Sequence, residues 1–223
     1  METQPSIKVN PEDSVEIPNS NVGSHLQPSL ARLYEIDCRL ADGNLEFFYS
    51  KFLEFPVADE TEFLDKMRNE ISSPTLLKDP PLDRDIDPGN HYPLGTLLSV
   101  RWPDHHKIGY LIFKISDSLK NIQFSSNYLP FTMDKANASS GQFSDAGKFD
   151  KKGNHIAPRN LLEKCKHAYF IVNGPKLPNQ NFDPFIRRFN IHVELLEFMT
   201  GTDTIINRIP IAIYPDVRNP GGN

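Results

Sequence analysis

The sequence predicts an all-β fold, a single antiparallel β-sandwich of about eight strands with one short helix and a jelly-roll-like or Greek-key topology. Several segments alternate apolar and polar side chains with a period of two, which is typical of half-buried strands. Turn-forming pairs such as Asp42-Gly43 and Thr200-Gly201 separate these segments. Only one segment has helical spacing, and strands and helices do not alternate regularly as they do around a parallel sheet.

The first two predicted strands form a hairpin. Residues 34–40 alternate between apolar and charged side chains, and Asp42-Gly43 predicts a tight turn before a returning strand over 45–55. Phe48 and Phe52 share one face of that strand, and its other face carries Leu45, Phe47, Tyr49, Leu53 and Phe55. Because both faces then need cover, we expect Phe48 and Phe52 to form an interface.

The predicted helix covers residues 60–72. Asp59 and Glu62 have the spacing of a capping box, and Ser73-Pro74 ends the segment. Phe63, Met67 and Ile71 recur every fourth residue and make a narrow apolar stripe. Either this stripe or a partner protein could cover the second face of the hairpin, and the sequence leaves the two alternatives open.

The remaining strands are predicted from the same alternation. They cover residues 94–102, 108–115, 120–124, 168–172, 188–195 and 205–213. The polar stretch 127–160 is long for a connection, and part of it is predicted to be a small hairpin around residues 151–154. Pro210 cannot donate a ladder hydrogen bond, so the last strand is predicted to be an edge strand or to carry a bulge.

These elements place one β-sandwich domain at residues 29–216. Residues 1–28 carry one lysine against four acidic residues, a net charge of −3, and no apolar period, so we expect a flexible acidic arm. Residues 217–223 are expected to form a flexible tail. The closing strand and tail, about residues 209–222, resemble those of small bacterial proteins, and this resemblance implies no activity.

Charge and composition exclude some functions. With 24 basic and 29 acidic residues, the net charge of −5 argues against general nucleic-acid binding. No apolar stretch approaches the ~18 residues of a membrane span. The first residues lack the features of a secretory signal, and there are only two cysteines, Cys38 and Cys165. We therefore expect a cytoplasmic protein without a membrane span.

An acidic loop is the candidate metal site. Asp83, Asp85 and Asp87 alternate along the chain, and carboxylates on a curved loop can converge on a hard cation such as calcium. The loop departs from an EF-hand, since Pro88 stands where glycine is needed and the closing glutamate is missing. A solvated acidic surface is the alternative, and no cofactor is expected on that interpretation.

The sequence indicates no set of catalytic residues, because it lacks a nucleophile elbow, a phosphate loop, a dinucleotide fingerprint and a zinc-helix motif. We therefore expect a non-catalytic binding or assembly module whose partner is another protein or a second copy of the chain. The main alternative is a metal-dependent sugar binder or hydrolase that uses the acidic loop, together with His91. A jelly-roll coat protein is a third interpretation, although the acidic arm is unsuited to packaging nucleic acid.

Overall fold

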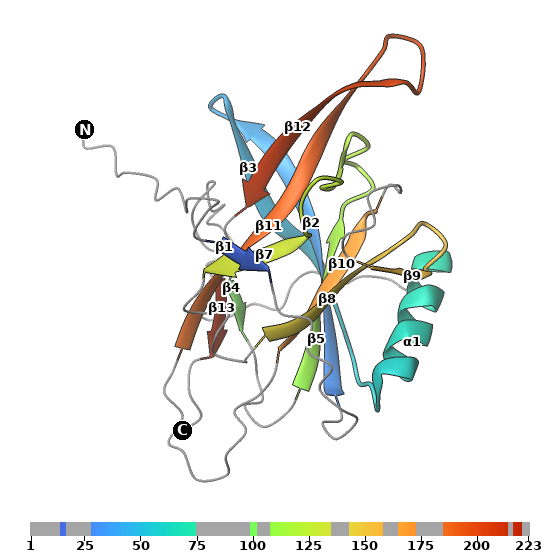
Figure 1. The fold of residues 1–223 in the computed structure, drawn as a ribbon, viewed down its shortest axis with the longest axis vertical. Helices are drawn as coiled ribbons and strands as arrows, with labels where there is room; N and C mark the ends of the chain where they lie inside the picture. The colour runs from blue at the N-terminus through green and yellow to red at the C-terminus, as the bar shows by residue number, and fades with distance from the viewer. Residues whose placement is uncertain are drawn as a thin grey trace, which may run out of the picture.

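The structure is a computed structural model of the 223-residue chain. It describes residues 14–16, 28–74, 99–101, 108–134, 143–157, 165–172, 185–213 and 216–219. These residues form thirteen strands and one helix, arranged as two sheets with the helix beside one of them (Figure 1). The protein is therefore mostly β, as predicted.

The first sheet has six strands and is mixed. In spatial order they are β3 (Asn44–Phe55), β2 (Pro28–Ala41), β5 (Ile108–Ile115), β10 (His167–Val172), β8 (Phe143–Phe149) and β9 (His155–Ile156). The β2–β3 pair is the predicted hairpin around Asp42-Gly43, and both turn residues adopt positive φ. The pairing of β2 with β5 is parallel, which makes the sheet mixed.

The second sheet has seven strands built around β11 (Phe185–Phe198). At fourteen residues, this strand is long enough to pair with different strands along its length. Its partners are β6 (Ile122–Phe124), β7 (Phe131–Asp134), β12 (Ile205–Ile213) and β13 (Asp216–Asn219). Two short strands extend the sheet, β1 (Ser14–Glu16) beside β7 and β4 (Ser99–Arg101) parallel to β13.

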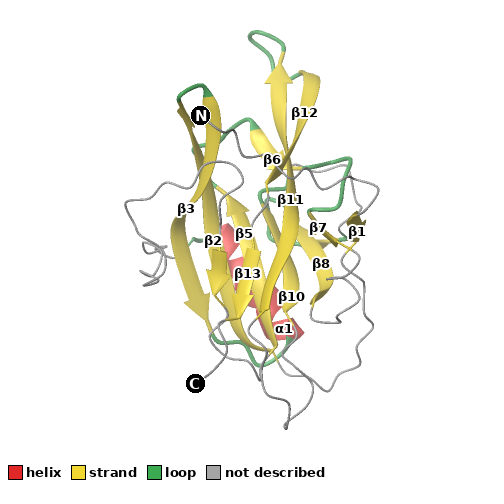
Figure 2. Ribbon diagram, turned by 90° about the vertical axis from the view of Figure 1, so that its left-hand side faces the viewer, coloured by secondary structure: helices red, strands yellow, loops and turns green. Residues whose placement is uncertain are grey.

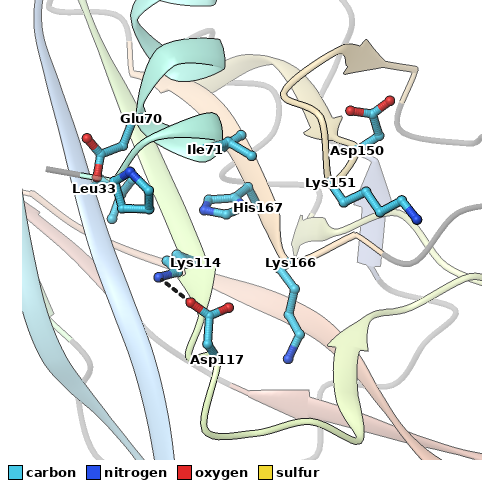
Figure 3. A pocket seen from close by; sticks show the side chains of 10 residues that line it. Leu33, Glu70, Ile71, Lys114, Asp117, Asp150, Lys151, Lys166 and His167 are labelled. Atoms are coloured by element: carbon cyan, nitrogen blue, oxygen red, sulfur yellow. Dashed lines mark ion pairs between the residues drawn. The ribbon is translucent and has the colours of Figure 1, made fainter.

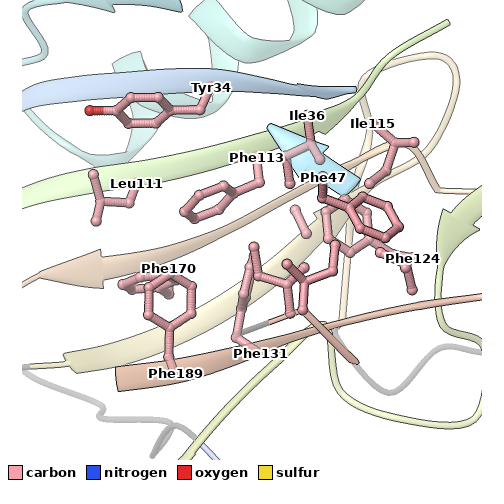
Figure 4. Close-up of a cluster of buried hydrophobic side chains, with 14 of the residues drawn as sticks. Tyr34, Ile36, Phe47, Leu111, Phe113, Ile115, Phe124, Phe131, Phe170 and Phe189 are labelled. Carbon is pink, nitrogen blue, oxygen red and sulfur yellow. The ribbon is translucent and has the colours of Figure 1, made fainter. Parts of the chain in front are cut away.

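The main hydrophobic core lies between the two sheets (Figure 4). Its centre is a group of aromatic rings, with Phe113 and Phe170 from the six-stranded sheet facing Phe131 and Phe189 from the other. The Phe170 ring centroid lies 5.1 Å from those of both Phe131 and Phe189, in edge-to-face geometry. Such edge contacts are the favoured arrangement for packed aromatic rings.

Helix α1 (Glu60–Ser72) covers the outer face of the six-stranded sheet (Figure 2). It begins as predicted, because the Asp59 side chain accepts a hydrogen bond from the Glu62 backbone N–H at 2.8 Å. Glu62 in turn accepts one from the Ala58 backbone N–H. The buried Phe63 and Met67 side chains pack into a second apolar cluster. The helix of the same chain therefore covers the part of this face that carries Leu53 and Phe55.

The predicted strand count and orientation are confirmed only in part. The structure has thirteen strands instead of about eight, and two of its strand pairs are parallel instead of antiparallel. Most of the additional strands have four residues or fewer, so alternation gives little signal for them. β1 lies within the predicted arm, and β13 begins at the last residue of the predicted domain and continues into the tail.

A β-bulge changes the predicted facing of β3. The pairing with β2 shifts so that Glu35 faces Lys51 while Ile36 faces Tyr49, leaving Ser50 as the extra residue. Phe52 therefore packs on the core between the sheets together with Tyr49. The prediction that Phe48 and Phe52 share a face is wrong, because one inserted residue reverses the alternation beyond it.

Candidate functional site

Two hairpins extend from the same end of the molecule, β2–β3 and β11–β12 (Figures 1 and 2). Most of the large apolar side chains that are exposed among the described residues lie on them. Leu40 is 73% exposed beside the first turn, and the second hairpin exposes Ile206 by 60%, Met199 by 51% and Ile209 by 38%. We call these four residues the hairpin patch.

Part of the hairpin patch continues the apolar layer between the sheets. Leu40 is the cross-strand partner of Leu45, and Ile209 is the partner of Leu195. Leu45 and Leu195 both pack against the main core. Because cross-strand partners lie on the same face of a sheet, Leu40 and Ile209 extend the two inner faces beyond the point where the core covers them.

A buried carboxylate fixes the second hairpin to the body of the protein. Glu194 on β11 is 1% exposed and accepts hydrogen bonds from the Gln123 side chain at 2.6 Å and from the Ser126 hydroxyl at 3.0 Å. Arg208 on β12 donates to the same carboxylate and to the Ser126 hydroxyl. These contacts connect β11 with β12 and with the segment around Gln123 and Ser126.

The outer edge of the second hairpin is unsuited to adding another strand. Among the described residues, β12 pairs with β11 alone, which confirms the predicted edge position. Pro210 lies in the middle of β12 opposite Glu194 and has no backbone N–H to offer a neighbouring strand. A contact at this end would therefore use side chains of the hairpin patch.

The predicted interface residues have different environments. Phe52 is half-buried, with its ring centroid 5.2 Å from that of Tyr34 and 5.9 Å from the Arg32 guanidinium. Phe48 is also half-buried and pairs with Asp37 of β2. Whether either residue forms an interface stays a prediction.

The predicted metal ligands Asp83, Asp85 and Asp87, together with His91, lie outside the described residues. Within the described ranges, no group of three or more histidine, cysteine, aspartate or glutamate side chains is placed to hold a metal ion. The same ranges contain no helix with the length and apolar character needed to cross a bilayer. The calcium site stays a prediction.

A row of polar side chains crosses the six-stranded sheet near the end of α1, and two of its members, Lys114 and His167, are drawn in Figure 3. Glu35, Lys114 and His167 are successive cross-strand partners on β2, β5 and β10, so all three side chains lie on the face that α1 covers. All three are buried. They adjoin a cavity of about 150 Å³ that Lys114 and His167 line together with the helix residue Ile71.

Ion pairs and burial determine the protonation of this row. Lys114 Nζ lies 2.9 Å from carboxylate oxygens of both Glu35 and Asp117. Burial alone would lower the pKa of Lys114, but hydrogen bonds to these two carboxylates outweigh it and raise the pKa. Burial, with the nearby Lys114 and Lys166 charges, lowers the pKa of His167 to about 3. The imidazole is therefore neutral at pH 7.

A second neutral histidine lies on the other sheet. His192 Nε2 is 2.7 Å from the Thr132 hydroxyl, which also accepts a hydrogen bond from the Asn190 side chain at 3.2 Å. Burial lowers the pKa of His192 to about 4. A hydroxyl beside a neutral imidazole can exchange a proton, although no carboxylate orients this ring among the described residues.

Sequence reasoning missed the polar row, since alternation placed Glu35 on the solvent face of its strand. The one local signal of a buried polar group was Lys114, which lies within the otherwise apolar segment 108–115. None of the comparisons with family models, curated proteins and solved structures finds a significant match to the chain.

Proposed function

We propose that this protein is a non-catalytic binding module that assembles through the hairpin patch, with a second copy of the chain as its partner. The observation that carries the proposal is that Leu40, Met199, Ile206 and Ile209 are exposed on two hairpins that extend from one end of the molecule. Exposed apolar side chains that gather at one end of a molecule can mark an interaction site.

The charges around the hairpin patch are consistent with self-association. Arg39 pairs with Glu46 at 2.8 Å, and Arg208 pairs with Glu194. Because these four charges are compensated within the chain, they add little like-charge repulsion when two copies bring their patches together. A two-fold contact also needs only one self-complementary surface, and this is the commonest arrangement in homo-oligomers.

The test is the mass of the protein in solution, measured by light scattering over a concentration series. We expect the wild-type chain to form a dimer or larger oligomer at roughly 50 μM, as a micromolar contact would. Ile206→Glu and Met199→Glu should each give a folded monomer, because a charge placed in an apolar contact loses its hydration. Thr61→Glu adds the same charge on the exposed side of α1 and should leave the mass unchanged.

A wild-type monomer at that concentration would refute the self-association. An oligomer that survives both hairpin substitutions would place the contact elsewhere on the chain, and so would contradict the assignment of the hairpin patch. Far-ultraviolet circular dichroism of each variant, compared with Thr61→Glu, separates loss of assembly from loss of folding.

On this proposal the module is cytoplasmic, and residues 29–216 form one β-sandwich domain that carries both hairpins. Cys38 and Cys165 are not joined in a disulfide, which is consistent with a reducing compartment. Burial and the neighbouring Asp37 raise the pKa of the Cys38 thiol, so it stays protonated at neutral pH.

A further inference from the structure

The cavity beside α1 joins an apolar wall to a polar one (Figure 3). Leu33 of β2, Ile71 of α1 and Pro74 after the helix supply aliphatic surface. His167 lies centrally among the other lining side chains in Figure 3, and Lys151 and Lys166 complete the lining on the opposite side. The space is about 150 Å³, below the ~300–1,000 Å³ of sites for drug-sized ligands, so it suits a molecule of few heavy atoms.

His167 is a buried polar group without a partner in this wall. Its side chain is 9% exposed, and its ring makes no hydrogen bond to any residue that the structure describes. A neutral imidazole carries one N–H donor and one acceptor nitrogen. Leaving a buried donor unsatisfied costs free energy, so buried polar groups normally have a partner. A ligand atom that accepts from the imidazole N–H would provide one.

The acidic residues of the lining already have interaction partners within the chain. Asp117 is paired with Lys114, and Asp150 accepts hydrogen bonds from the Lys152 and Asn154 backbone N–H groups, each at 2.8 Å. The third acidic side chain of the lining, Glu70, also has an interaction partner. Asp117 and Asp150 therefore already have donors, so a ligand need not supply them.

Two of the three ammonium groups keep hydrogen-bond donors for a ligand. Lys166 Nζ donates to the Leu119 carbonyl at 2.6 Å and to the Ser116 carbonyl at 3.3 Å, which leaves its third N–H. Within the described part of the chain, neither Lys166 nor Lys151 forms an ion pair with a carboxylate. Lys166 and Lys151 thus keep hydrogen-bond donors at the cavity lining, with their ammonium groups pointing away from the His167 ring in Figure 3.

We infer that this cavity binds a short aliphatic carboxylate, with its carboxylate towards His167, Lys166 and Lys151 and its carbon chain against Leu33 and Ile71. Lysine binds carboxylates as a point charge with several donors, and the imidazole N–H adds a directed hydrogen bond. The aliphatic wall distinguishes such a ligand from a fully polar oxyanion, which would leave that surface uncovered.

The test is titration calorimetry of the full chain with sodium butyrate, alongside butylamine and inorganic phosphate. We expect saturable butyrate binding with a Kd of about 1 mM, in keeping with a ligand of so few atoms, and weaker binding of both comparison compounds. The His167 ring resonances in NMR spectra should shift along the same saturation curve.

Adjacent lysines give a matched pair of variants. Lys151 lines the cavity, while Lys152 lies in the same turn outside the lining, and both side chains are exposed. We expect Lys151→Met to weaken butyrate binding about threefold and Lys152→Met to leave it unchanged. Lys166→Met should weaken it about tenfold, since this lysine is more buried.

Several outcomes would overturn the inference. These are the absence of saturable butyrate binding, tighter binding of butylamine, and phosphate binding as tight as that of butyrate, because the last would mean that the aliphatic wall contributes nothing. Equal affinities for the Lys151→Met and Lys152→Met variants would place the butyrate elsewhere. Lys151 is exposed, so this comparison holds even if Lys166→Met does not fold.

Discussion

The Phe63 ring lies flat against the Tyr110 ring, with the centroids 3.7 Å apart and the planes 2° from parallel. This contact joins α1 to β5, and both side chains are almost fully buried. We expect Phe63→Ala to lower the free energy of unfolding by about 3–5 kcal/mol, through lost burial and the cavity left behind. Urea unfolding measures the change, with the exposed Thr61→Ala as a control expected to stay within about 0.5 kcal/mol.

Helix α1 could be predicted because its signals are local. The Asp59 cap, the Glu62 carboxylate three residues later and the spacing of Phe63 and Met67 all lie within one short segment, and the structure confirms each of them. The β2–β3 hairpin was predictable for the same reason. Its turn has positive φ at Asp42 and Gly43, and an Asp-Gly pair is typical of such a turn.

The features that sequence reasoning missed depend on register between distant segments. Glu35 alternates like a solvent-facing residue, yet it lies opposite Lys114, 79 positions away, on a face that α1 covers. The bulge at Ser50 is a single inserted residue with no signature of its own, although it decides which way Phe52 points. The exposure of Leu40 and Ile209 in the hairpin patch likewise depends on where the opposite sheet stops covering their faces, which the sequence does not show.

Two glycines provide a matched test of how the β8–β9 turn packs on α1. Gly153 and Gly43 both have positive φ, of 78° and 80°. A Cβ added at Gly153 would lie 2.6 Å from the Arg68 Cα, whereas one at Gly43 would meet no atom within 4 Å. We expect Gly43→Ala to cost about 1–2 kcal/mol for backbone strain, and Gly153→Ala a further 1–3 kcal/mol for overpacking.

Thermal and urea unfolding of the two alanine variants checks this difference. Equal losses of stability would show that the turn moves away from α1 without cost. In that case the close approach to Arg68 would contribute little to the position of the helix.

The buried histidines should make the protein less stable in mild acid. His167 and His192 have folded-state pKa values of about 3 and about 4, below the ordinary value of 6.5. The unfolded chain therefore binds protons below pH 6.5 that the folded chain does not, and stability falls as the pH falls towards the folded pKa values. Each histidine should remove roughly 1 kcal/mol between pH 6 and pH 5.

Urea unfolding at these two pH values, above the range where most carboxylates titrate, measures the loss. His192→Phe should reduce the loss between pH 6 and pH 5, and so should His167→Phe. A loss that is unchanged in both variants would mean that other groups cause it.

The acidic loop gives a prediction about calcium. Asp83, Asp85 and Asp87 lack the bidentate glutamate that closes a tight calcium loop, so we expect weak binding at most. Titration calorimetry of the full chain with calcium chloride measures the affinity. Submicromolar binding that disappears in Asp85→Asn would favour the metal-dependent sugar binder or hydrolase over the assembly module.

The two predicted interface phenylalanines should respond differently to the same substitution. Phe52 packs on Tyr34 beside the Arg32 guanidinium, so Phe52→Lys would place a second cation there and bring a charge to the core. We expect it to lower the free energy of unfolding by about 2–4 kcal/mol. Phe48 lies opposite Asp37 on β2, where a lysine would gain an opposite charge as its cross-strand neighbour. Phe48→Lys should therefore leave the protein folded.

The oligomeric state of the Phe48→Lys variant then shows whether the Phe48 side chain belongs to the interface. If Phe48 belongs to the interface, this folded variant has a lower mass in solution than the wild-type chain under the same conditions. If the hairpin patch alone makes the contact, the mass is unchanged, and Ile206→Glu reduces it instead. Light scattering of the two variants side by side distinguishes these results, because both changes add one charge to exposed or half-buried apolar surface on different hairpins.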